Sequence, residues 1–241
     1  MNSGGKPVSK VQRWLHKPAS VKLQAVAYNI ARWLDARRDR ALARRHGLDF
    51  AGLIQPADLG SAHPHSQRHA NTYEPFDGMA LRTVLYEAMR SGTAFTRFID
   101  IGSGKGKACL YAARSLGLPE VLGVEFSPPL IAIARANAQK LGLTQVRFVE
   151  ADAAQFQLPD GPNLVFLFNP FDQTILEAFL ANNLAHFQRH GSVIAYGNDR
   201  DRAVLARFGF ATLYRDQVLK LSVHAWSDRA QAGTASAVPA L

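Results

Sequence analysis

The chain has 241 residues, of which 47% are hydrophobic, so it is long enough to bury one large α/β domain together with an appendage. A single cysteine, Cys109, excludes a disulfide framework and a cysteine-based metal cluster. No run approaches the roughly 18 apolar residues of a membrane span. The N-terminus also lacks the apolar core of a signal peptide, so we expect a cytoplasmic protein.

Positive charge is concentrated at the N-terminus. Residues 1–46 contain eleven Lys and Arg against two acids, so the whole net charge of +9 lies there. Between residues 20 and 45, apolar side chains recur at i, i+3, i+4 and i+7, which predicts a helix whose apolar stripe is buried against another surface. The stripe consists of Leu23, Val26, Ala27, Ile30, Trp33 and Leu34.

Two interpretations of this helix stay open. In the first, it packs over the core and keeps its basic face in water. In the second, its arginines bind an acidic partner, whether nucleic acid, an anionic membrane surface or an acidic protein. No aromatic residues alternate with these arginines, which disfavours binding of single-stranded RNA by base stacking. The arginines are Arg37, Arg38, Arg40, Arg44 and Arg45.

Residues 47–75 have little regular pattern. His63, His65 and His69 invite a metal site, but Pro64 breaks any helical face and no carboxylate or cysteine follows at ligand spacing. We therefore expect a solvated loop and predict no metal. Tyr73 lies just before the next helix, and residues 1–75 form a basic helical appendage and lid segment in this interpretation.

Residues 76–227 alternate between strand and helix patterns, which implies a parallel sheet with helices on both faces, closed by an antiparallel hairpin. Residues 228–241 consist largely of Ala, with Gly, Thr, Ser and one proline, and this composition predicts a disordered tail. The expected strands are 97–101, 120–125, 145–150, 163–168, 192–196, 210–214 and 218–225. The expected helices are 77–89, 105–116, 128–141, 174–189 and 200–207.

A glycine-rich turn follows the first of these strands and reads Asp100-Ile-Gly102-Ser103-Gly104-Lys-Gly106. Glycines at i, i+2 and i+4 let backbone amides at a helix start approach a ligand with no side chain in the way. Two better-known loops do not match. The phosphate-binding loop of NTPases needs Ser or Thr after its lysine, and the dinucleotide fingerprint needs its third glycine one residue later than Gly106.

Acidic and amide side chains follow the next three strands. Glu125 ends the second strand, 19 residues after Gly106, where a carboxylate accepts the ribose hydroxyls of a nucleoside. Asp152 follows the third strand and Asn169 the fourth. Because ligands of open α/β sheets bind over the carboxyl ends of the strands, this placement predicts a nucleoside site there.

The acid-x-Gly-x-Gly-x-Gly pattern and Glu125 resemble the class I S-adenosylmethionine-dependent methyltransferases. That resemblance implies a Rossmann-like, seven-stranded, mostly parallel sheet of order 3-2-1-4-5-7-6 with an N-terminal helical appendage. It implies S-adenosyl-L-methionine as cofactor and S-adenosyl-L-homocysteine as product. The implied cofactor-binding residues are Asp100, Gly102, Ser103, Gly104 and Gly106 beside the methionine portion, Glu125 at the ribose, Phe126, Asp152 and Ala153 at the adenine, and Asn169.

The methyl acceptor is less constrained by the sequence. Asn169-Pro170-Phe171-Asp172 stands where nucleic-acid and glutamine amino-methyltransferases carry Asn-Pro-Pro-Tyr/Phe, but the second proline is missing. Residues 73–172 also resemble the non-SET histone-lysine methyltransferases and related bacterial enzymes, which favours a protein or small-molecule amine. The implied acceptor-side residues are Asn169, Tyr73 and Asp172, with Tyr73 covering the methionine end of the cofactor.

Other functions stay open. The chain can be an RNA or DNA methyltransferase that uses its basic helix, or an adenosylmethionine-binding module without catalysis. If it fails to bind adenosylmethionine, a nicotinamide-dependent oxidoreductase becomes the better interpretation.

Overall fold

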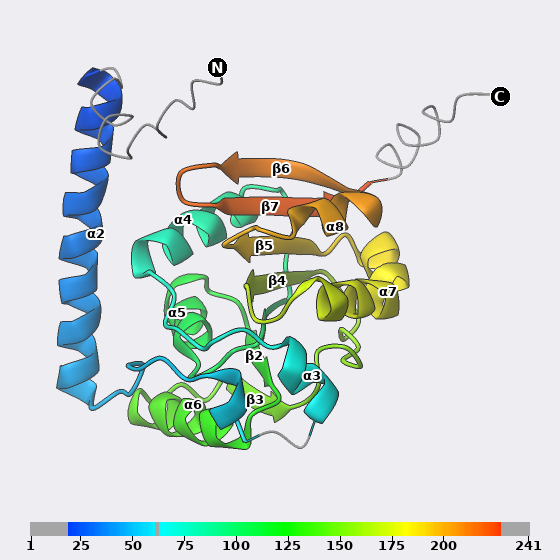
Figure 1. Ribbon diagram of the computed structural model, residues 1–241, viewed down its shortest axis with the longest axis horizontal. Helices are drawn as coiled ribbons and strands as arrows, with labels where there is room; N and C mark the ends of the chain where they lie inside the picture. The colour runs from blue at the N-terminus through cyan, green and yellow to red at the C-terminus, as the bar shows by residue number, and fades with distance from the viewer. Residues whose placement is uncertain (1–18, 61–62, 228–241) are drawn as a thin grey trace, which may run out of the picture.

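A computed structural model describes residues 19–60 and 63–227, with side chains described at Val26 and from Tyr28 onward. The predicted tail at 228–241 lies outside this part. The framework is a seven-stranded sheet of order β3-β2-β1-β4-β5-β7-β6, which confirms the expected topology (Figure 1). The strands are β1 (Arg97–Ile101), β2 (Glu120–Glu125), β3 (Val146–Glu150), β4 (Asn163–Phe168), β5 (Val193–Gly197), β6 (Phe210–Asp216) and β7 (Leu221–Trp226).

Helices cover both faces of this sheet. The strands from β3 to β5 are parallel, whereas β7 runs antiparallel to both β5 and β6. Alternate strand residues enter opposite cores, as Phe98 and Ile99 do. One core receives α4 (Gly78–Met89), α5 (Lys107–Ser115) and α6 (Pro128–Lys140), and the other receives α7 (Gln173–His190) and α8 (Arg202–Arg207).

Two aspartates fix the starts of helices beside the carboxyl ends of the strands. Asp77 caps α4 by accepting the N–H groups of Met79 and Ala80, each at 3.1 Å. Asp172 caps α7 by accepting the Thr174 N–H at 2.9 Å. Ser127 stands at the N-cap position of α6 but makes no such bond, because its hydroxyl donates to the Leu59 carbonyl instead.

The prediction of a solvated loop around the three histidines was wrong. Pro64–His69 form a short helix, α3, preceded by a single 3-10 turn, η1 (Pro56–Asp58). Pro64 occupies the first turn of α3, where a missing N–H costs no helical hydrogen bond and the fixed φ suits the helix. The proline therefore starts a helix instead of interrupting one.

The predicted burial of the N-terminal apolar stripe was also wrong. The helix itself, α2 (Ala19–His46), lies along the edge of the molecule beside α4 (Figure 1). Four of its apolar side chains are exposed: Val26 at 48%, Ile30 at 54%, Trp33 at 53% and Leu34 at 46%. The side chains of Leu23 and Ala27 lie outside the described part.

Ion pairs attach α2 to the core. Asp35 is buried and pairs with Arg82 of α4, and Asp39 pairs with Lys107 of α5 at 2.7 Å. Arg32 donates to Asp77 at 2.8 Å. Among the described helices, none combines the length and apolar composition that a bilayer crossing requires.

Candidate functional site

A cavity lies over the carboxyl ends of β1 to β4. The segment that precedes α4, residues 49–60 and 63–76, covers it, and we call this segment the roof. The cavity brings together eight of the side chains or loop positions singled out in the sequence, from four different strand ends and from the roof. These are Tyr73, Asp100, Gly102, Ser103, Glu125, Phe126, Ala153 and Asn169. Gly104 and Gly106 lie next to it in the glycine loop, whereas Asp152 and Asp172 do not line it.

The glycine loop is held tightly against β2 and against the roof. The N–H groups of Gly102 and Ser103 both donate to the Val124 carbonyl, at 2.8 and 3.0 Å. Gly102 and Gly104 have positive φ angles of 78° and 53°. A Cβ at Gly102 would overlap Pro170, and a Cβ at Gly104 would lie 2.7 Å from Cδ2 of Tyr73. Both positions therefore require glycine for conformation and for space.

Glu125 organises the backbone of the site. Its buried carboxylate accepts the Gly104 N–H at 2.8 Å on one oxygen, and the Phe126 and Ser127 N–H groups at 3.0 Å on the other. Burial raises its pKa, and the three backbone hydrogen bonds act in the opposite direction. A carboxylate has about four lone-pair sites, so one remains for a ligand hydroxyl.

Asp100 adds a second buried carboxyl to the same cavity. Burial raises its pKa to about 8; the hydrogen bond from the Cys109 thiol lowers it and the nearby Glu125 raises it. Lys105 and Lys107, the nearest lysines in sequence, pair with Asp49 and Asp39 instead of with Asp100 or Glu125. Two buried carboxyls without a cation of their own suit a positively charged ligand, because such a ligand would remove their mutual repulsion.

The roof is fastened to the glycine loop through Lys105. Its buried ammonium donates to both Asp49 carboxylate oxygens, at 2.9 and 3.0 Å, and to the Ala51 carbonyl at 2.6 Å. Asn137 of α6 joins them by donating to the carbonyls of Asp49 and Lys105 at 2.9 and 3.1 Å. Sequence reasoning missed this lysine, although its place inside the glycine motif was a usable signal.

Tyr73 lies in the roof directly above Gly104. Its backbone pairs with Ile54, and its hydroxyl donates to the Phe50 carbonyl at 3.1 Å. Burial raises the pKa of this phenol, and the nearby Asp49 and Glu125 raise it further. The ring thus covers the loop, while the hydroxyl is already engaged.

Asp152 follows β3 and faces α3 rather than the cavity. Its carboxylate accepts the Ser66 hydroxyl at 2.6 Å and the Ala154 N–H at 2.9 Å, and His63 lies 3.9 Å away. Asp152 does not line the cavity, so contact with an adenine amino group requires its carboxylate to move toward the cavity. Its neighbour Ala153 does line the cavity.

Asn169 occupies a strained backbone position at the end of β4, with φ of 45°. Its side-chain Oδ1 is buried and has no hydrogen-bond partner in the described part of the chain. Asn71 of the roof uses the neighbouring backbone: its side chain donates to the Asn169 carbonyl at 3.0 Å and its N–H to the Pro170 carbonyl at 3.1 Å. Nothing in the sequence marked Asn71, because its role depends on a contact between segments about a hundred residues apart.

Asp172 caps α7 and also pairs with His69 at 2.8 Å. Burial opposes ionisation of this carboxyl, but the hydrogen bonds from His69 and Thr174 lower its pKa overall. The pair fixes α3 to the Asn-Pro-Phe turn, where Ala70 bridges to Phe171.

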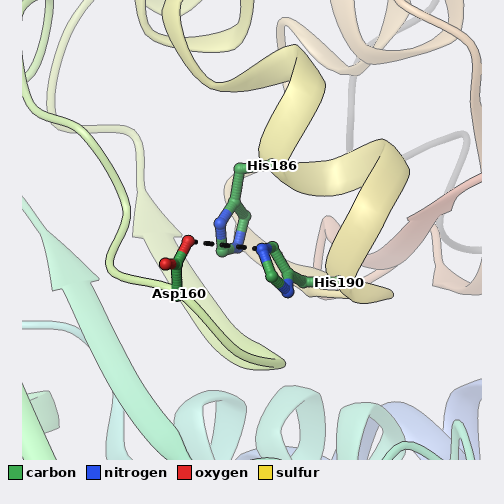
Figure 2. A group of neighbouring side chains, drawn as sticks. All are labelled: Asp160, His186 and His190. Atoms are coloured by element: carbon green, nitrogen blue, oxygen red, sulfur yellow. Dashed lines mark ion pairs between the residues drawn. The ribbon is translucent and has the colours of Figure 1, made fainter.

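A separate cluster far from the cavity contains Asp160, His186 and His190 (Figure 2). His190 Nε2 lies 3.4 Å from Asp160, whose side chain is 93% exposed. His186 Nε2 is already within hydrogen-bond distance of Ser192 Oγ, at 2.8 Å, and of the Asn163 amide, at 3.1 Å. Burial and the neighbouring His190 lower the pKa of His186 to about 4. These contacts give the cluster a packing role at the end of α7.

Comparison with known proteins agrees with this arrangement. Residues 93–199, which contain β1 to β5, match the family model described as a methyltransferase domain. The chain is 43% identical over 65 residues to demethylmenaquinone methyltransferase of Thermus thermophilus, a match that covers 27% of this chain and 29% of that protein. It is 29% identical over 166 residues to 23S rRNA (uracil(1939)-C(5))-methyltransferase RlmD of Xanthomonas campestris, covering 60% of this chain and 36% of the relative.

Among solved structures, TrmN from Thermus thermophilus is 23% identical with a TM-score of 0.48, over 61% of this chain and 48% of that one. The chain spans about a third of the length of the two curated relatives. The basic helix α2, the roof and the β6–β7 hairpin all lie outside the matched domain.

Proposed function

We propose that the chain is a class I S-adenosylmethionine-dependent methyltransferase that transfers a methyl group to an amine nitrogen of a protein or small molecule. The observation that carries the choice of acceptor is the buried, unpartnered Oδ1 of Asn169 at the cavity. An unpaired buried acceptor is costly, so a ligand N–H is its natural partner.

The residues at the cavity fit S-adenosylmethionine. The buried carboxyls of Asp100 and Glu125 suit a ligand that carries positive charge, and Ser103 offers a second buried polar atom without a partner in the described chain. Phe126 and Ala153 supply apolar surface for the adenine. When bound, the cofactor supplies a methyl group already activated on a sulfonium.

The roles of the chain's own residues follow from their positions. Asn169 Oδ1 accepts the N–H of a neutral amine and thereby orients its lone pair. The roof excludes water through Tyr73 above Gly104 and through Phe76, whose ring stacks on Phe168 with centroids 4.1 Å apart. In this proposal, alignment and water exclusion account for most of the rate enhancement. Asp172 acts indirectly by holding the Asn-Pro-Phe turn.

One observation opposes a uracil carbon as the methyl acceptor. Methylation of a uracil carbon, named for the rRNA relatives, needs an added nucleophile to activate that carbon. The only cysteine, Cys109, is fully buried against Asp100, and burial raises its pKa well above its usual range.

The test uses tritiated S-adenosylmethionine with the protein, small-molecule and RNA fractions of a cell extract. We expect label in the protein or small-molecule fraction. Label only in RNA would contradict the amine proposal and leave the methyltransferase assignment intact. Cofactor binding without transfer to any fraction would indicate a binding module.

One substitution tests Asn169 directly. Asn169→Gly removes the side chain but tolerates φ of 45°, and we expect turnover to fall by about threefold to tenfold, the loss of one neutral hydrogen bond. Affinity for S-adenosylhomocysteine should change little. Asn198→Gly is the matched control, since Asn198 has φ of 53° and does not line the cavity. Equal turnover in the two variants would remove Asn169 from the mechanism.

A further inference from the structure

The face of α2 that points away from the protein is an unusual surface. Val26, Ile30 and Trp33 recur at i, i+4 and i+7, which places them on one side of the helix, and Leu34 extends the same side. About half of each side chain is exposed. Asp35 follows Val26 by nine residues, or about two and a half turns, and so lies on the opposite side. The apolar side of α2 therefore faces solvent because its acidic side faces the core.

The charge of this face is uniformly positive in the described chain. Both acids of α2 point inward, where they pair with Arg82 and Lys107. Their negative charge therefore compensates basic residues of the core and not the arginines of α2. Arg37 continues the apolar stripe by stacking its guanidinium 4.7 Å from the centroid of the Trp33 ring. Arg38, Arg40, Arg44 and Arg45 are exposed, and none of them has an ion-pair partner among the described residues.

From these observations we propose that the exposed face of α2 binds an anionic lipid bilayer. An anionic bilayer can bind the apolar side chains and the arginines of this face at the same time. The aliphatic side chains and Trp33 enter the boundary between headgroups and acyl chains, and the arginines contact the anionic headgroups. The exposed face of α2 lies outside the cavity, so its binding to lipid does not depend on the methyl acceptor.

Other occupants match only part of the face. A nucleic acid would pair with the arginines but would leave Val26, Ile30 and Leu34 without a favourable environment. A second copy of α2 would cover the apolar side chains but would place arginines against arginines, because the described part of this face has no acid.

The test is flotation of the full chain with vesicles of phosphatidylcholine, with and without phosphatidylglycerol. We expect binding only to the vesicles that contain phosphatidylglycerol, with weaker binding at high salt. Ile30→Ser/Trp33→Ser should reduce the affinity by about tenfold or more. Leu213→Ser/Val218→Ser is the matched control and should bind like the parent, because it changes two exposed apolar residues of the β6–β7 hairpin and leaves α2 intact.

Charge is tested separately. Arg37→Ser/Arg44→Ser should weaken vesicle binding roughly fivefold for each arginine, since one basic residue near an anionic surface is worth about 1 kcal/mol. Arg114→Ser/Arg189→Ser removes two exposed arginines from α5 and α7 and should have little effect.

Fluorescence gives a second readout that does not rely on a polar substitution. Phosphatidylglycerol vesicles should shift tryptophan emission to the blue in the parent and much less in Trp33→Phe. No vesicle binding by the parent, or equal binding by the apolar variant and its control, would overturn the proposal. Loss of binding to a single-stranded RNA oligonucleotide in the same variants, without vesicle binding by the parent, would assign the face to nucleic acid. Variant-sensitive dimerisation without vesicle binding would assign it to self-association.

Discussion

Replacing Gly104 by alanine tests how closely the roof lies on the glycine loop. The new Cβ would overlap the ring of Tyr73, reaching 2.7 Å from Cδ2, so the ring has to move. Movement threatens the hydroxyl contact with Phe50 and the bridge to Ile54. Such overpacking typically costs about 1–3 kcal/mol of the free energy of unfolding.

Backbone strain must be separated from this clash. Gly104 has φ of 53° and Gly142 has φ of 65°, so alanine at either position incurs about 1–2 kcal/mol of left-handed strain. A Cβ at Gly142 meets nothing within 4 Å. The difference between Gly104→Ala and Gly142→Ala, measured by urea denaturation, therefore reports the clash alone.

A double-mutant cycle with Tyr73→Ala completes the test. We expect Gly104→Ala to cost about 1–3 kcal/mol more than Gly142→Ala in the parent, and about the same as Gly142→Ala once Tyr73 is removed. An excess that persists in the Tyr73→Ala background, or no excess at all, would refute the contact between roof and loop.

Three further predictions concern groups around the cavity. Asp49→Ala should destabilise the protein more than Lys105→Met, because it leaves the buried ammonium without its counterion; denaturation and the rate of proteolysis within residues 49–73 measure this. Asp100 holds a proton up to about pH 8, above its unfolded pKa of 3.8, so its contribution to stability is present at low pH and is lost as the pH rises to about 8. Asp100→Asn should flatten that decline in pH-dependent unfolding, and an unchanged slope would contradict the raised pKa. Asp172→Asn should retain the cap of α7 and unfold at a higher temperature than Asp172→Ala, by an amount equivalent to about 1 kcal/mol.

The sheet order and the cluster of ligand-facing groups were predictable because both follow from local patterns. Alternating strands and helices restrict the topology, and groups that follow consecutive parallel strands meet at one edge. For this reason the cavity is lined by Asp100, Glu125 and Asn169. Glu125 was nevertheless expected only to hold ribose, and its three bonds to backbone N–H groups depend on loop geometry that a sequence pattern does not specify.

The errors came from contacts between distant segments. Periodicity identified the apolar stripe of α2 but not the direction it faces, which is set by Arg82 and Lys107 pairing with Asp35 and Asp39. Ser127 stands at the N-cap position of α6, but its hydroxyl donates to a carbonyl 68 residues away instead of capping the helix. Such competition is decided by tertiary structure, so single-sequence reasoning was most accurate for the sheet and least accurate for the appendage and roof.

The most direct test of the central claim is calorimetric titration of the full chain with S-adenosylhomocysteine. The cavity predicts binding at one site. Glu125→Ala should weaken that binding about tenfold to a hundredfold, the range for loss of a charge-assisted hydrogen bond. Glu150→Ala should leave it unchanged, because Glu150 ends the neighbouring strand in register with Glu125 but is exposed. Absence of binding by the parent, or an equal loss in both variants, would contradict the assignment of this cavity to the cofactor.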